Sequence, residues 1–125
     1  MRKFFVTLIV LLMFVARADA AEISCADSTF AFETINQKLR EWNCTPLKIW
    51  YSDVALDDAA NVAYMNTLAK DGNKFTACML FYSDFSSPPD NGTITAWKYD
   101  SVYKNYSWYF GRREDGTWQL MTWGY

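Results

Sequence analysis

Three polar side chains in the second half of the chain have the chemistry of an acid–base site. Asp84 follows a long apolar run, so apolar neighbours could raise the pKa of its carboxyl group and make it a general base. Tyr82 and Arg112 could donate hydrogen bonds to a substrate carbonyl or carboxylate. Together they define one hypothesis, an isomerase or dehydratase that uses Asp84 as its base.

Each of these residues also has a simpler interpretation, which the sequence favours. An aspartate before a Pro-rich loop commonly binds backbone N–H groups and caps the loop. Tyr82 suits a core tyrosine whose hydroxyl is hydrogen-bonded, and Arg112 suits a solvated surface arginine. We therefore expect no catalytic residue, and Asp84 is the one candidate if there is an enzyme.

The absence of histidine excludes several chemistries. Without histidine the chain has no Ser-His or Cys-His nucleophile pair and no imidazole metal ligand. The three cysteines, Cys25, Cys44 and Cys78, are too few and too widely spaced for a four-cysteine zinc site. We expect neither a metal nor a cofactor.

The tryptophans point to binding. Trp97, Trp108 and Trp123 could stack against a sugar or another flat apolar ligand, although packing in the core is the plainer alternative. Aromatic residues make up 18% of the chain, and a small domain cannot bury all of them. The candidate ligand-binding set is Tyr82, Trp97, Trp108, Arg112 and Trp123.

A C-terminal hairpin must position most of these side chains. Asp115-Gly116 between two aromatic runs predicts a two-residue type I′ turn. That register places Trp108 opposite Trp123, Phe110 opposite Met121, Arg112 opposite Gln119 and Tyr106 opposite Tyr125, and a three-residue loop would shift it. Both hairpin faces are apolar. One should pack on helices, and the other should line a cavity, meet a partner or stay partly exposed.

Two helices are expected. The first runs over Ser28–Trp42, capped by Asp27 or Ser28 and closed by Pro46. Its apolar stripe contains Phe32, Ile35, Leu39 and Trp42. The second runs over Asp57–Lys70, with Asp57 or Asp58 as its cap and Val62, Met65, Leu68 and Ala69 facing inward.

The remaining segments complete an α+β fold. Leu47–Ser52 predicts a short strand, Lys74–Phe85 a central strand covered on both faces, and Thr93–Tyr99 a short strand around Trp97. We expect a single domain, residues 21–125, with two helices packed on one face of a curved antiparallel sheet of four to five strands, in a cone-like roll.

The cysteines leave the redox state open. A helix between Cys25 and Cys44 would keep their Cα atoms too far apart for a disulfide. Cys78, in the middle of a strand, suits a buried free thiol. Cys44–Cys78 and Cys25–Cys78 are the pairings that stay open.

Residues 1–20 have the features of a secretory signal peptide. A basic tip precedes an apolar run from Phe4 to Val15 and a small-residue cleavage pattern at Ala18-Asp19-Ala20. We expect export to the periplasm or the extracellular space, with no integral membrane segment after cleavage. A net charge of −2 without a basic cluster argues against nucleic-acid binding.

Several motifs resemble those of a bacterial secreted family without an assigned function. They are Ser83-Asp84-Phe85-x-Ser87-Pro88, Trp97, Trp108-Tyr109-x-Gly111-Arg112 and the terminal Asp115-Gly116-x-Trp118-x-Leu120-x-Thr122-Trp123-Gly124-Tyr125. That family resembles the nuclear transport factor 2-like superfamily, which includes ketosteroid-isomerase-like enzymes, dehydratases and non-catalytic binding modules. The resemblance implies an α+β roll with a pocket in its mouth and transfers no catalytic residue.

The sequence thus predicts a small exported, non-catalytic domain that binds a small molecule or a protein through an aromatic sheet face or pocket. Two alternatives stay open. One is the Asp84-dependent enzyme, and the other is a structural or dimerising module of the cell envelope, with a homodimer as its assembly.

Overall fold

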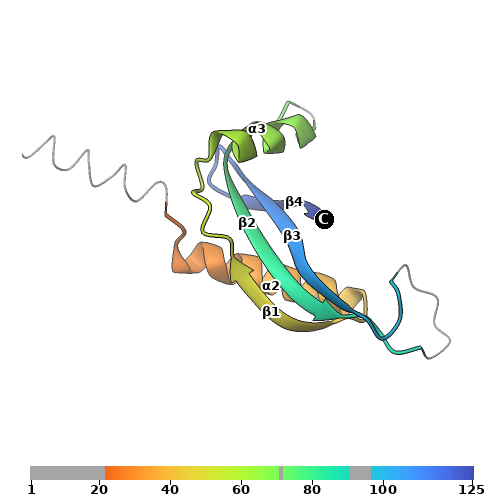
Figure 1. Ribbon diagram of the computed structural model, residues 1–125. Helices are drawn as coiled ribbons and strands as arrows, with labels where there is room; N and C mark the ends of the chain where they lie inside the picture. Colours follow the sequence, from red (N-terminus) through yellow and green to blue (C-terminus); the bar gives the residue numbers. More distant parts are fainter. Residues whose placement is uncertain (1–21, 71, 91–96) are drawn as a thin grey trace, which may run out of the picture.

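The computed structural model describes residues 22–70, 72–90 and 97–125, and the expected signal peptide lies outside them. Two helices and four strands follow one another along the chain (Figure 1). They are α2 (Cys25–Glu41), β1 (Thr45–Tyr51), α3 (Ala59–Leu68), β2 (Phe75–Ser86), β3 (Val102–Arg113) and β4 (Trp118–Gly124). The α+β class is confirmed.

The four strands form one antiparallel sheet in the order β1-β2-β3-β4. The expected central strand is confirmed, because β2 lies between β1 and β3 and is mostly buried along its length. Its apolar residues on both faces require cover from both sides. Figure 1 shows β2 and β3 as the two long, curved strands at the centre of the molecule.

Helix α2 begins and ends earlier than expected. Ser24 is its N-cap, since its Oγ accepts a hydrogen bond from the Asp27 backbone N–H at 3.1 Å. Asn43, with φ 58°, follows the Trp42 C-cap and turns the chain out of the helix. Pro46 therefore does not close the helix. It lies in edge strand β1, where a missing N–H is tolerated.

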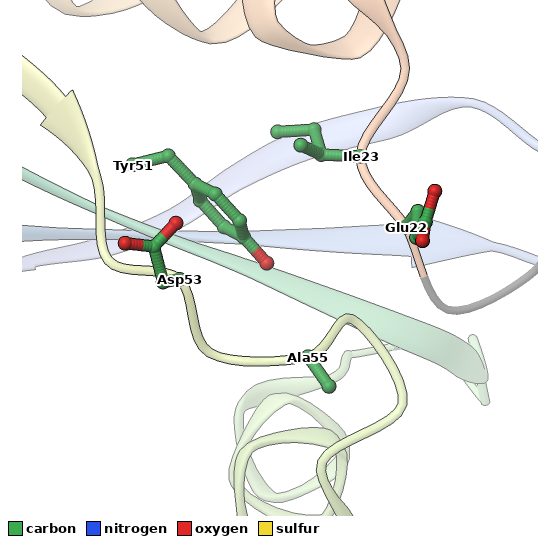
Figure 2. Close-up of a pocket in the computed structure, with 5 residues that line it drawn as sticks. All are labelled: Glu22, Ile23, Tyr51, Asp53 and Ala55. Carbon is green, nitrogen blue, oxygen red and sulfur yellow. The ribbon is translucent and has the colours of Figure 1, made fainter.

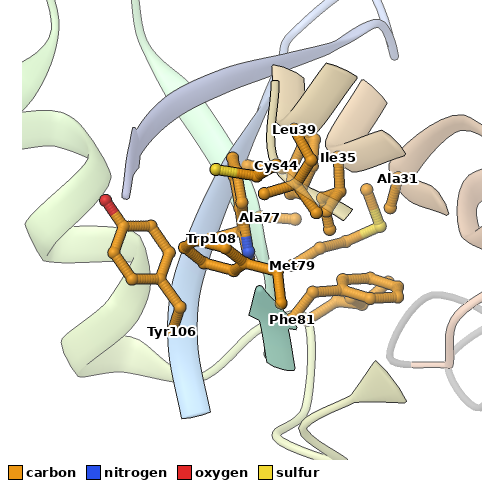
Figure 3. Close-up of a cluster of buried hydrophobic side chains, with 12 residues drawn as sticks. Ala31, Ile35, Leu39, Cys44, Ala77, Met79, Phe81, Tyr106 and Trp108 are labelled. Carbon is orange, nitrogen blue, oxygen red and sulfur yellow. The ribbon is translucent and has the colours of Figure 1, made fainter. Parts of the chain in front are cut away.

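The core between α2 and the sheet is apolar and closely packed (Figure 3). Ile35 and Leu39 are fully buried, and each such side chain contributes roughly 1.5–3 kcal/mol of transfer free energy. Ala31 lies on the same stripe in place of Phe32, which is 36% exposed. The sheet side of this core consists of Ala77, Met79, Phe81, Phe85, Tyr106, Trp108 and Phe110.

Helix α3 packs on the opposite face, so the expectation that both helices share one face is wrong. Its Met65 is buried against Phe75 and Cys78, and Cys78 points away from the neighbouring Ala77 and Met79. Asp58 caps α3 as expected, accepting from the Asn61 N–H at 3.0 Å. The helix ends at Leu68, two residues before the predicted end.

The cysteines follow this two-sided arrangement. All three are free thiols, and Cys44 and Cys78 are buried. Cys44 belongs to the core on the α2 side, whereas Cys78 belongs to the cluster on the α3 side. The sheet separates their sulfurs, which accounts for the absence of a bond between these two. Burial raises the pKa of the Cys78 thiol to about 12, with a smaller contribution from Asp58.

The hairpin turn differs from the predicted type I′ turn. Arg113 and Thr117 close the loop through a 2.8 Å hydrogen bond, and only Gly116 in it has a positive φ, 89°. This is the pattern of a three-residue loop with glycine in the left-handed position. Asp115 stabilises it by accepting from the Thr117 backbone N–H at 2.9 Å.

A register shift in β4 then restores part of the predicted pairing. Near the turn, Arg112 pairs with Trp118 and Phe110 with Leu120, so the predicted partners Gln119 and Met121 are wrong. Beyond the irregularity between Tyr109 and Phe110, Trp108 pairs with Trp123 as expected. The rings of Tyr106 and Tyr125 also meet, with centroids 5.3 Å apart.

The segment between β2 and β3 is anchored at its base. The Ser87 N–H donates to the Ser101 carbonyl at 2.8 Å, and the Asp100 N–H donates to Pro88 at 3.0 Å. The expected strand 93–99 lies partly outside the described residues, and Trp97 to Asp100 form a bend and a turn instead. No helix in the described part of the chain is long and apolar enough to cross a membrane.

Candidate functional site

A cavity of about 230 Å³ lies between α3, the middle of β3 and the C-terminal end of β4. We call it the aromatic pocket. It is lined by Tyr64, Ser107, Tyr109, Trp123, Gly124 and Tyr125. Five of these six residues come from the C-terminal hairpin segment. The rings of Trp123 and Tyr125 contact Trp108 and Tyr106 on the α2 side of the sheet, whereas Tyr109 projects to the α3 side.

Small residues make room for the pocket. Ser107 and Gly124 are paired across β3 and β4 and present little or no side chain. On one side Tyr64 meets Tyr109 edge to face, with ring centroids 5.3 Å apart. On the other side Tyr125 extends from the end of β4 and is 82% exposed. The pocket therefore combines fixed aromatic walls with an open side.

The side chains that line the pocket carry no formal charge at physiological pH. Burial raises the pKa of Tyr109, and Tyr82 and Tyr64 raise it further, so its hydroxyl stays protonated and able to donate. The pKa of Tyr125 is also raised, by partial desolvation and by Tyr103, although most of this side chain is exposed. Such walls suit an uncharged ring with hydrogen-bonding groups at its edge.

Trp123 lines the pocket, but its indole belongs to a cluster of tryptophans on the α2 side of the sheet. The centroids of Trp97, Trp108 and Trp123 lie 5.3, 5.6 and 5.8 Å from that of Trp42. The structure thus brings together the three predicted tryptophans, but around a fourth that was assigned only to the helix stripe. Its position one turn after Leu39 at the end of α2 is the signal that could have identified it.

The four members of this cluster differ in exposure. Trp108 is fully buried, and its Nε1 donates to Ser83 Oγ at 2.8 Å, which fixes the orientation of its ring. Trp97 and Trp42 are half-buried. Trp123 is 41% exposed, with Lys38 Nζ 5.4 Å from its ring centroid. Of the predicted binding tryptophans, Trp123 has the most surface to offer a ligand.

The polar candidates lie elsewhere. Tyr82 is on the α3-side face, where its ring centroid is 5.8 Å from that of Trp50. Asp84 Oδ1 accepts a 2.9 Å hydrogen bond from the backbone N–H of Asn105, whose φ of 57° marks an irregular position in β3. This is the backbone-capping role given to Asp84 as its simpler interpretation, although here it caps a neighbouring strand.

Arg112 is remote from the aromatic pocket, near the opposite end of β4. Its guanidinium carbon lies 5.5 Å from the Trp118 ring centroid, and Trp118 Nε1 donates to Asp27 at 2.9 Å. The expected neighbour of Arg112, Gln119, instead accepts a hydrogen bond from Arg113. The structure therefore does not bring Arg112 together with Tyr82 or Asp84.

A second cavity, of about 370 Å³, lies beside the N-terminal end of α2 (Figure 2). It is lined by Glu22, Ile23, Tyr51, Asp53 and Ala55. The Tyr51 hydroxyl donates to the Val54 carbonyl. Within the described residues no group of three or more cysteine or carboxylate side chains could hold a metal ion. This acidic pocket contains none of the predicted site residues.

Comparisons of the chain with protein-family models, with curated proteins and with solved structures found no match. The geometry of the site is therefore the basis for a functional assignment, and the resemblance to the nuclear transport factor 2-like superfamily stays a prediction.

Proposed function

We propose that this protein is a non-catalytic binding domain that holds a flat, uncharged ligand ring in the aromatic pocket. The observation that carries the proposal is the composition of the walls, where the aromatic rings of Tyr64 and Tyr109 lie beside two small residues, and no lining side chain carries a formal charge. Residues 1–20 support the further proposal that it acts outside the cytoplasm.

The size of the pocket limits the ligand. Pockets for drug-sized molecules are roughly 300–1,000 Å³, so a volume of about 230 Å³ suits one ring rather than a large cofactor. Aromatic faces favour apolar ring surfaces, whereas the hydroxyls of Ser107, Tyr64 and Tyr109 offer hydrogen bonds to groups at the ring edge.

Binding is a better account than catalysis by Asp84. A general base must come within hydrogen-bond reach of a bound substrate. The two described pockets are lined by other residues, and the Asp84 carboxylate holds the backbone of β3. A domain that binds without reacting needs only the aromatic walls.

The test replaces Tyr109 with alanine and measures affinity for single-ring probes, namely monosaccharides and their phenyl glycosides, by calorimetry. Loss of the phenol ring should weaken binding about tenfold or more, as expected when roughly 55 Å² of apolar contact is removed. Tyr64→Ala should act in the same direction.

Trp118→Ala is the control, because it removes an aromatic side chain from the same hairpin at the end remote from the pocket. It should leave the affinity unchanged. If the wild-type protein binds none of the probes, or if Tyr109→Ala and Trp118→Ala behave alike, the proposal is wrong.

A further inference from the structure

One transverse row of residues connects the aromatic pocket with the opposite edge of the sheet. Trp50 pairs with Tyr82, Tyr82 with Ser107, and Ser107 with Gly124, so the row crosses all four strands. Ser107 and Gly124 already line the pocket. Three strand spacings make the row roughly 14 Å long, which is longer than a single ring requires.

The far end of the row carries a second pair of aromatic side chains. Trp50 and Tyr82 are both half-buried, with ring centroids 5.8 Å apart and planes inclined at 41°. Helix α3 does not lie over this pair, because its buried contacts are with Phe75 and Cys78 near the other end of β2. Parts of both rings therefore remain available on the α3-side face.

Charged groups beside this pair are balanced. Lys48 pairs with Asp84 in the adjacent position of the register, and Lys48 Nζ lies 4.7 Å from the centroid of the Trp50 ring. An ammonium and a carboxylate side by side give no net attraction for a polyanion or a polycation. They do provide a donor and an acceptor for hydroxyl groups.

We propose that the row is an extended carbohydrate-binding site, in which the aromatic pocket holds one sugar ring and Trp50 with Tyr82 holds a further ring of the same chain. The inference rests on the proposed function and names its ligand class. A sugar chain presents apolar ring faces and hydroxyl edges at regular intervals. The row offers the aromatic pair Trp50 and Tyr82 at one end and the small residues Ser107 and Gly124 at the other, where Tyr64 and Tyr109 supply the aromatic surface. Balanced polar groups lie beside the Trp50 end.

The experiment measures affinity as a function of chain length. Neutral glucose- and N-acetylglucosamine-based oligosaccharides of one to four units are titrated into wild-type protein and into Trp50→Ala. The wild-type affinity should rise about tenfold between the shortest and longest chains of a series that binds, the gain expected when one more ring buries roughly 55 Å² of apolar surface. In Trp50→Ala this gain should disappear, with single-ring affinity unchanged.

Two further variants distinguish a failure of the extended site from a failure of the single-ring pocket. Tyr82→Ala should also remove the gain with chain length, and Trp118→Ala should retain it. If single rings bind but longer chains bind no more tightly, or if the gain persists in Trp50→Ala and Tyr82→Ala, the extended site is wrong and the pocket stands. If no oligosaccharide binds while other flat probes do, the carbohydrate class is wrong. If no single-ring probe of any kind binds, the proposed function is wrong, and the extended site is wrong with it.

Discussion

At the scale of single residues, the aromatic side chains divide into those that are buried in the core and those that are exposed to solvent. Trp108 has no exposed surface and donates its one side-chain N–H to Ser83 Oγ. Trp123, its partner across the hairpin, is 41% exposed and packs on Trp42 at the same face. Tyr109 projects from the opposite face and meets Tyr64 in the pocket. One face of the hairpin therefore contributes to the core, and the other contributes to the pocket.

The bond between Trp108 and Ser83 gives a residue-scale prediction. Ser83→Ala leaves the buried indole N–H without its acceptor, and such a group costs about 1–3 kcal/mol. We expect that loss in the free energy of unfolding measured by urea titration. In a Trp108→Phe background the same serine change should cost clearly less, because no indole N–H remains. Equal costs in both backgrounds would contradict the assigned role of the hydrogen bond.

At the scale of elements, the contact of α3 with the sheet depends on a glycine. A Cβ placed on Gly111 would lie 2.6 Å from the Phe75 ring, closer than atoms can approach. Phe75 in turn is held to α3 through Asn66, whose Oδ1 accepts from the Phe75 N–H at 2.9 Å. The glycine in β3 is therefore what allows β2 to present this ring to the helix.

Gly111→Ala should destabilise the protein by about 1–3 kcal/mol through overpacking, as measured by thermal or urea unfolding. In a Phe75→Leu background the same glycine change should cost less, because the smaller side chain leaves room for the methyl group. Gly111→Ala with unchanged stability, or with the same cost in both backgrounds, would show that the ring moves aside at little cost.

At the scale of the whole molecule, thiols and phenols are buried on both sides of the sheet. Burial is the largest cause of the raised pKa values of Cys44, Tyr51, Cys78, Tyr106 and Tyr109. Each raised pKa means that the folded state prefers the protonated form. The stabilisation is complete below the ordinary pKa of the unfolded chain and is lost as pH rises towards the folded value.

Stability should therefore fall on the alkaline side, for Cys78 between its ordinary value of 9.0 and about 12. Urea unfolding at pH 8 and pH 10.5 measures the difference. Cys78→Ala should show a smaller loss between these two pH values than the wild type, since one titrating group has been removed. A wild type that is equally stable at both pH values would refute the prediction.

How far the sequence predicts the site depends on the kind of residue. Asp58 as a cap, β2 as a central strand and the Trp108–Trp123 pair follow from local rules of capping, alternation and hairpin pairing. The neighbours of Arg112 do not, because a three-residue loop shifts the register near the turn and a bulge restores it further along.

The sequence by itself determined the two helices, the strands β1 and β2, the α+β class and the aromatic hairpin, because these depend on side-chain periodicity and turn chemistry over a few residues. Only the tertiary structure decided that α2 and α3 cover opposite faces, that Trp42 gathers the tryptophans, and that Tyr64 closes the aromatic pocket. Both faces of the central strands are apolar, so periodicity cannot assign a helix to either. That choice is made when the complete set of side chains packs together.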